Sequence, residues 1–295
     1  MGVAVARRAR CPRVSPADGF MPRMDVIMDV ASVLAELEEH CAETLGEHDG
    51  RRMAALARRG YCLAPVEDGG TPAGRSRFGG GALLDPETEW PHVEGIPLNF
   101  MAVLDAEVLA PWLGEELPAV PGLLNFFYFE PDLPYEQYRR FDVFTDPRCW
   151  RVVPADPQRA EERPAPSPAH VFDPRPMAAA PIISLPNYDE SVVQDLLDSC
   201  DKRGMPRWLD AFDLGNVWQS EIDYPAYDCG HHHRAFGWPL PLQGGFLRDG
   251  EVHLLQLDSD DQWQFGDFGL LYYAIPIDAL RAGDFSQVRV EMQCH

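Results

Sequence analysis

Two stretches of the chain repeat one pattern, and this internal echo limits the possible folds more than any single motif does. Each stretch holds an Arg, a Phe-Gly pair, a Trp-Pro pair, a Leu-Asp pair that closes an apolar run, and a Gly followed by two Leu residues. In the first stretch these are Arg77, Phe78-Gly79, Trp90-Pro91, Leu104-Asp105 and Gly122-Leu123-Leu124; in the second they are Arg234, Phe236-Gly237, Trp238-Pro239, Leu257-Asp258 and Gly269-Leu270-Leu271. The pattern predicts two duplicated β-rich units, with chance similarity of composition as the alternative.

Short apolar runs bounded by Gly and Pro predict strands. These runs are residues 98–104, 122–129, 252–258, 269–275 and 288–294, and they are rich in aromatic and β-branched residues. Helical spacing of apolar residues instead predicts helices within 30–59 and 187–204, and a helical turn at 277–282. We therefore predict an α+β fold in which antiparallel sheets bury their apolar faces against each other and helices flank them.

Composition shifts divide the chain into five predicted segments. They are a disordered arm at 1–24, a helical segment at 25–60, a first β-rich unit at 61–153, a Pro-rich linker at 154–186, and a helix with a second β-rich unit at 187–295. The linker is predicted because eight prolines between 154 and 181 remove backbone donors. The alternative for the arm is upstream sequence before a start at Met24 or Met28.

The charge of the chain is strongly one-sided. Its 295 residues carry a net charge of −22, and residues 1–60, with nine Arg and nine acids, contribute none of it. Such an acidic body repels nucleic-acid phosphates and anionic lipid, so we expect neither nucleic acid nor a membrane as a partner. It suits a basic protein partner or a cation, and the simpler interpretation is a solvated acidic surface.

Cysteine usage and hydropathy suggest a compartment. The seven cysteines are scattered and form no C-x-x-C pair, which is typical of free thiols in a reducing environment. No apolar run approaches the roughly 20 residues that a membrane span needs. We expect a cytoplasmic protein.

The densest polar cluster is Asp258-Ser259-Asp260-Asp261, followed by Gly266-Asp267. Carboxylates at this density are candidate oxygen ligands for Ca²⁺ or Mg²⁺. The helix-loop-helix calcium pattern fails, because Trp263 stands where it requires Gly. The alternative is a turn at a strand end, since Asp side chains bond to turn backbone.

A second cluster is Asp228-Cys229-Gly230 followed by three histidines. In an extended chain Cys229, His231 and His233 share one face, which would suit zinc. We keep His231 and His233 as candidate metal ligands, with a polar loop as the alternative.

Motifs for covalent catalysis or phosphate binding are weak. No G-x-S-x-G elbow occurs, and the Gly79-Gly80-Gly81 run after Arg77 has no G-K-[ST]. Trp-Pro pairs such as Trp238-Pro239 pack against a core edge or line a ligand groove. Arg77, Trp238 and Gln243 remain candidate ligand-binding residues beside Asp258, Asp260 and Asp267.

The repeated stretches also carry a family resemblance. Residues 76–109 and 121–129, and later 233–245, 254–280 and 284–290, resemble the YwqG-like family, a bacterial family of unknown function. The LLQLDSD…GDFGLLYY block is the most specific part, and Phe236-Gly237-Trp238-Pro239 departs mildly from a Gly-Gly-Tyr-Pro-like turn. The resemblance implies an α+β fold and a soluble cytoplasmic protein, and it brings no activity or site residues.

Two functional hypotheses follow. The first is a binding or interaction protein without chemistry, for which a basic protein is the suggested partner. The second is a metal-dependent or small-molecule enzyme, with a site that combines Gln243, the Asp258–Asp267 segment and His231–His233. We favour the first, because no catalytic motif accompanies the acidic body.

Overall fold

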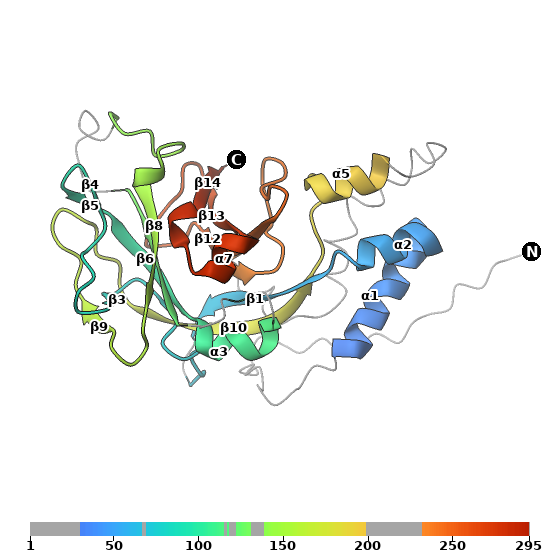
Figure 1. The fold of residues 1–295 in the computed structure, drawn as a ribbon, viewed down its shortest axis with the longest axis horizontal. Coiled ribbons are helices and arrows are strands. Elements are labelled where there is room, and N and C mark those ends of the chain that lie inside the picture. The colour runs from blue at the N-terminus through green and yellow to red at the C-terminus, as the bar shows by residue number, and fades with distance from the viewer. Residues whose placement is uncertain are drawn as a thin grey trace, which may run out of the picture.

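One antiparallel sheet of ten strands organises the computed structural model (Figure 1). Its strand order is β14-β13-β12-β11-β1-β10-β2-β6-β7-β8. The bounds of these strands are β1 Arg58–Pro65, β2 Arg77–Phe78, β6 Asn99–Asp105, β7 Leu123–Tyr128, β8 Trp150–Ala155, β10 Arg175–Ser184, β11 Arg234–Phe236, β12 Glu251–Asp258, β13 Leu270–Pro276 and β14 Arg289–Gln293. The structure describes residues 30–66, 69–114, 117, 122–130, 139–198 and 232–294, so the predicted arm at 1–24 lies outside it.

The remaining elements are short strand pairs and helices. The strands are β3 Ala82–Leu84 with β9 Glu161–Arg163, and β4 His92–Val93 with β5 Ile96–Pro97; the helices are α1 Val30–Leu45, α2 Glu47–Ala54, α3 Ala106–Leu113, α5 Ser191–Asp198 and α7 Ile277–Ala282, with the 3₁₀ turns η2 Pro147–Cys149 and η4 Phe285–Gln287. The mixed helix and antiparallel-strand composition confirms the predicted α+β class. The predicted turn at 277–282 is α7.

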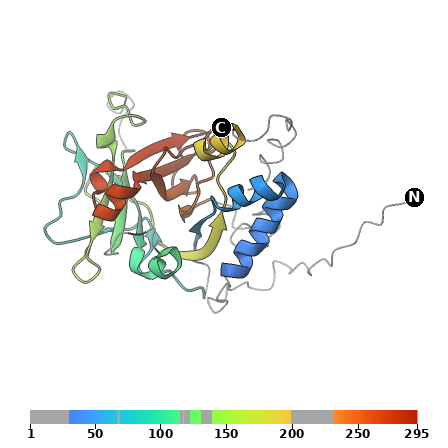
Figure 2. The ribbon, with the colours of Figure 1, turned by 45° about the vertical axis from the view of Figure 1, so that its right-hand side comes forward.

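Helices α1, α2 and α5 gather at one end of the molecule (Figures 1 and 2). Leu37 and Cys41 of α1 and Met53 of α2 form a buried cluster that includes Val193 of α5. The sequence predicted that a second helix would continue to residue 59, but α2 ends at Ala54 and β1 begins at Arg58. Pairing of β1 with β10 along eight residues outweighs the weak local helical preference of this stretch.

The predicted linker at 154–186 contains a central strand instead. Strand β10 lies within this range and places Met177 and Ile182 in the interior, at 0% and 4% exposure. Prolines obscured it because they normally avoid central strands. Here β10 pairs with β1 over eight residues but with β2 over only two, so much of its second edge needs no ladder donor.

The two ends of the sheet curl towards each other. Trp150 Nε1 at the start of β8 donates to the Val288 carbonyl beside β14, at 2.9 Å. Across the interior, the Phe126 and Tyr273 rings meet edge to face with centroids 5.1 Å apart. Strands from both predicted β-rich units therefore share one sheet and one core.

The strand order has the same pattern on both sides of the β1–β10 pair. Strand β1 pairs with β11, and β10 pairs with β2, so each of the two central strands has a short strand along its outer edge. The next strands outward, β6 and β12, each shift register once, between Phe100 and Ala102 and between His253 and Leu255. The outermost strands β8 and β14 each follow a 3₁₀ turn that an Asp side chain caps.

Matching contacts accompany this order. The Asp105 main-chain N–H donates to Ser76 Oγ, and its carboxylate accepts from the Arg75 N–H, both at 2.9 Å. The Asp258 N–H donates to His233 Nδ1 at 3.0 Å, and its carboxylate accepts from the His232 N–H at 2.8 Å. Duplicated units would produce such a correspondence, and the duplication stays a prediction.

Strand register refines the alignment that the sequence suggested. Arg77 pairs with Val103 and Arg234 pairs with Gln256, so Gly79 corresponds to Phe236 and not to Gly237. Gly79 and Phe236 both have positive φ, at 60° and 58°. The repeated Phe-Gly pairs of the sequence are thus one residue out of register.

Candidate functional site

The predicted Asp258–Asp267 segment begins as a turn at the end of β12. One Asp260 carboxylate oxygen accepts from the Gln262 main-chain N–H at 2.8 Å, and Trp263 Nε1 donates to the Asp258 carbonyl at 2.8 Å. His233 lies beside this turn because its Nδ1 accepts from the Asp258 N–H. The structure thus brings together three of the predicted site residues, Asp258, Asp260 and His233.

A buried ion pair lies at the centre of this region. Arg175 Nη2, from β10, contacts Asp260 Oδ2 at 2.6 Å, and the Asp260 side chain is only 1% exposed. The Arg175 guanidinium lies 4.9 Å from the Trp263 ring centroid and 5.4 Å from that of Phe78. We call this group the Asp260 cluster; its members are Phe78, Phe172, Arg175, His233, Asp260 and Trp263.

The chemistry of the Asp260 cluster is that of a shielded charge pair. Because His233 Nδ1 accepts a hydrogen bond, a neutral ring carries its proton on Nε2, which lies 3.9 Å from Asp260 Oδ2. That distance is too long for a hydrogen bond, so the His233 ring and the Asp260 carboxylate interact only electrostatically. The His233 side chain is 0% exposed, so a ligand reaches this pair only if the surrounding side chains rearrange.

The other predicted site residues make contacts elsewhere. Arg77 bonds to the Gly81 carbonyl and to Glu162, and burial lowers its pKa. Trp238 is 2% exposed, with its ring beneath the Arg58 guanidinium at 3.8 Å and its Nε1 bonded to the Leu56 carbonyl. Gln243 bonds to the Cys294 carbonyl.

Two of the predicted candidates remain. Asp267 is exposed, and the structure gives it no contact with the Asp260 cluster. His231 lies outside the described residues, and a ligand role for it stays a prediction. Within the described part of the chain, no three His, Cys, Asp or Glu side chains are arranged to hold a metal ion. No helix in that part is long and apolar enough to cross a membrane.

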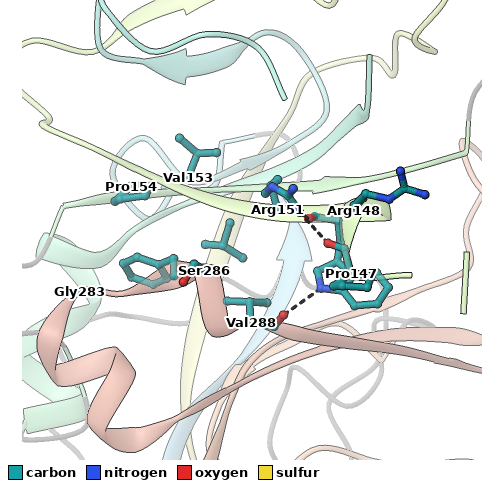
Figure 3. Close-up of a pocket in the computed structure, with 11 residues that line it drawn as sticks. Pro147, Arg148, Arg151, Val153, Pro154, Gly283, Ser286 and Val288 are labelled. Atoms are coloured by element: carbon teal, nitrogen blue, oxygen red, sulfur yellow. Dashed lines mark hydrogen bonds between the residues drawn. The ribbon is translucent and has the colours of Figure 1, made fainter. Parts of the chain in front are cut away.

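A cleft of about 520 Å³, open to solvent on one side, lies where the two ends of the sheet meet (Figure 3). We call it the seam cavity. One wall comes from η2 and β8, with Arg151, Val153 and Pro154; the opposite wall comes from the segment around η4, with Ser286 and Val288. The hydrogen bond from Trp150 to Val288 joins the two walls.

The two walls of the seam cavity are corresponding segments of the fold. Leu123 pairs with Ala155 and Leu270 with Gln293, so Trp150 corresponds in register to Val288. Asp146 and Asp284 cap the turns that precede these residues, accepting from Arg148 N and Ser286 N respectively. The cavity therefore lies between the two halves of the molecule.

Two arginines, Arg148 and Arg151, line one wall of the seam cavity. Arg148 is neutralised by Asp146, with Nη2 at 2.7 Å from its carboxylate, and lies 3.5 Å from Glu94. Arg151 Nη1 instead donates to two main-chain oxygens, those of Pro147 and Trp150, each at 2.6 Å. Among the described residues, no carboxylate lines the cavity. This wall is cationic within a chain of net charge −22.

Sequence comparison supplies a family. A family described as a domain of unknown function, DUF1963, matches residues 76–294. The chain belongs to this family. The match spans about three quarters of the chain, 219 of 295 residues, and includes the blocks on which the YwqG-like resemblance rested. It does not test that name, and no curated protein matches the chain.

The DUF1963 match begins later than the folded unit. Strand β1, at residues 58–65, precedes the matched range yet occupies the middle of the sheet. Its Leu63 is 1% exposed, and Tyr61 donates to the Leu109 carbonyl at 3.0 Å. A fragment restricted to the matched range would lack a central strand.

Sequence reasoning missed Arg175 and the whole seam cavity. Arg175 was assigned to the predicted linker, where no ion pair was expected. The seam was detectable in principle, because Asp146-Pro147-Arg148 and Asp284-Phe285-Ser286 precede matching edge strands. Extending the internal echo to these segments would have pointed to it.

Two buried ionisable groups make opposite contributions to pH stability. Burial lowers the pKa of His253 from 6.5 to about 4, and its Nδ1 donates to the Phe236 carbonyl at 3.0 Å. Burial raises the pKa of Glu130 from 4.5 to about 7. The unfolded chain therefore takes up the His253 proton first as pH falls, and it releases the Glu130 proton first as pH rises.

We expect these two effects to offset each other between pH 4.5 and 6.5. His253 destabilises the fold as pH falls through this window, by up to about 3 kcal/mol. Glu130 destabilises it as pH rises through the same window, by somewhat less because its side chain is partly exposed. Glu130→Gln should steepen the loss of stability in acid, and His253→Asn, which keeps a donor for Phe236, should reverse the slope.

Urea unfolding at pH 4.5, 5.5 and 6.5 measures these slopes. The matched control is Glu161→Gln, which removes an exposed carboxylate from β9. Parallel curves for the wild type, Glu130→Gln and His253→Asn would contradict the assigned roles.

Proposed function

We propose that the protein is a binding protein whose ligand is a small molecule held in the seam cavity. The observation that carries this proposal is the position of the cavity between the corresponding walls of the two halves. Its volume, about 520 Å³, falls within the range of roughly 300–1,000 Å³ usual for small-molecule sites. Apolar surface from Val152, Val153 and Phe285 with a few polar groups also fits such a site.

A small molecule fits this seam better than an added peptide strand. Peptides that extend a sheet need main-chain donors and acceptors along a free edge. Strand β8 carries Pro154, which has no N–H, and the Trp150 carbonyl already accepts from Arg151. Proline on an edge strand is a common means of blocking such pairing.

The enzyme hypothesis at the Asp260 cluster has weaker support. Its charged groups neutralise each other, and His233 and Asp260 are buried. A basic protein partner remains a second proposal for the outer surface, motivated by the net charge of −22. Such association would weaken strongly with added salt. The cationic wall of the seam makes that cavity an unsuitable place for a basic partner.

A neutral fluorescent probe tests the binding proposal. We expect N-phenyl-1-naphthylamine, an uncharged apolar amine, to bind one site and gain fluorescence as it leaves water. Ser286→Trp should weaken this binding at least tenfold, because a bulky side chain at an exposed lining position fills the cavity. Asp261→Trp, at an exposed position in the turn after β12, is a bulky substitution outside the lining.

Fluorescence titration with matched thermal melts separates loss of binding from loss of folding. Absence of one-site binding to the folded wild type, or equal binding by Ser286→Trp, would contradict the seam as the ligand site.

A further inference from the structure

We propose that the ligand of the seam cavity is an organic anion, with an acidic head group bound by Arg151 and an apolar body against the opposite wall. This inference rests on the proposed binding function and names the chemical class of its ligand. It is based on which charged side chains around the seam cavity already have ion-pair or hydrogen-bond partners.

Arg151 is held in place by neutral acceptors. Its two hydrogen bonds to the Pro147 and Trp150 carbonyls use Nη1 alone, and these neutral acceptors fix the guanidinium. Among the described residues no ion pair involves Arg151, whereas Arg148 beside it has Asp146 and Glu94. Arg151 therefore keeps Nε and Nη2, which together suit two oxygens of a carboxylate or a sulfonate.

The nearby carboxylates are engaged by their own turns. Asp146 accepts from both the main chain and the guanidinium of Arg148. Asp284 accepts from the N–H and hydroxyl of Ser286 and from the Gln287 amide. These bonds lower the pKa of each carboxyl and orient the oxygens towards η2 and η4. In the described structure neither residue lines the seam cavity or accepts a hydrogen bond from Arg151, although the charge of Arg151 adds to the hydrogen bonds from Arg148 in lowering the pKa of Asp146.

The remainder of the lining accommodates an apolar body. Phe285 and Val288 of one wall lie across the cavity from Val152 of the other, and Trp150 links the two walls. A ligand with a single acidic end can thus place its charge at Arg151 while its hydrocarbon part leaves water. An anion without an apolar part would gain only the exposed charge contact, which is weak.

A pair of probes that differ in charge tests the inference. 8-Anilinonaphthalene-1-sulfonate carries the same fused aromatic body as N-phenyl-1-naphthylamine and adds one sulfonate. We expect the wild type to bind the sulfonate probe about tenfold more tightly than the neutral probe, the range expected for a charge-assisted hydrogen bond. Arg151→Gln should remove that preference and change the affinity for the neutral probe less than twofold.

Two further variants test the sign of the charge effect and the specificity of Arg151. Ser286→Glu places a carboxylate in the wall opposite Arg151 and should weaken sulfonate binding at least tenfold while the neutral probe still binds. Arg281→Gln removes an exposed arginine of α7 that does not line the cavity and should change neither affinity. Thermal melts of each variant confirm folding.

The outcomes separate the two proposals. Failure of both probes to bind one site overturns the binding function itself. Binding of both probes with equal affinity, or a sulfonate preference that survives Arg151→Gln, overturns only the assignment of an anionic ligand.

Discussion

Replacing Asp260 with alanine is expected to lower the free energy of unfolding by about 3 kcal/mol. The substitution leaves the Arg175 guanidinium among the Phe78 and Trp263 rings without its carboxylate, which lies 2.6 Å away in the intact protein. It also removes the acceptor for the Gln262 N–H in the turn after β12. Urea unfolding with a thermal melt measures the loss.

Asp267→Ala is the matched control for this prediction. Asp267 belongs to the same acidic segment but is exposed, so its removal should change stability by less than about 0.5 kcal/mol. Arg175→Met in the Asp260→Ala background should recover part of the loss, since the uncompensated charge is then gone. If Asp260→Ala melts like the wild type but loses a bound ligand, the Asp260 cluster is a binding site and our structural interpretation is wrong.

Gly269→Ala is expected to cost at least about 3 kcal/mol. A Cβ at this position would lie 2.1 Å from the Gln293 carbonyl oxygen, 2.7 Å from that of Phe265 and 2.8 Å from the Cα of Cys294. All three neighbours are main-chain atoms of paired segments, so relief requires β14 to move away from β13. The equivalent Gly122 is similarly confined, with a Cβ 2.8 Å from the Ala155 carbonyl oxygen.

Gly95→Ala separates this steric effect from backbone strain. Gly95 has a φ of 81° and no atom within 4 Å of an added Cβ, so its substitution should cost only about 1–2 kcal/mol. Chemical denaturation of the two variants measures the difference directly. A Gly269→Ala variant no less stable than Gly95→Ala would show that the β13–β14 edge can shift freely.

The same steric and backbone constraints explain why glycines occur in the most specific sequence block. In Gly266-Asp267-Phe268-Gly269 the first glycine has a φ of 57°, Phe268 has a φ of 49°, and Gly269 has no room for a side chain. Backbone conformation and close packing thus account for both glycines. This block, the most specific part of the family resemblance, connects two strands of the sheet.

The sequence correctly predicted five of the ten strands of the large sheet, because their signals are local. Aromatic and β-branched runs predicted 98–104, 122–129 and 269–275, and the structure has β6, β7 and β13 within one residue of these bounds. The Ile277–Ala282 helix was also predicted to the residue. Strand β10 was missed, since its prolines indicate an extended loop unless the pairing partners are known.

The candidate sites were predictable only in part. Asp258 and Asp260 are adjacent in sequence to the turn that positions them, so their proximity could be inferred. The partner of Asp260 is Arg175, which is 85 positions away in the chain. Only the sheet order, in which β11 and β1 lie between β12 and β10, brings them together.

The sequence alone therefore determined the α+β class, half of the strand positions in the large sheet and the existence of an internal echo, because each depends on side chains a few residues apart. Tertiary structure alone decided how the two similar halves are arranged relative to each other. It joined both halves into one sheet around β1 and β10, buried Asp260 against Arg175, and brought η2 and η4 together to form the seam cavity. These contacts join residues tens to more than a hundred positions apart, and their geometry is set by strand register and sheet curvature, which no local pattern encodes.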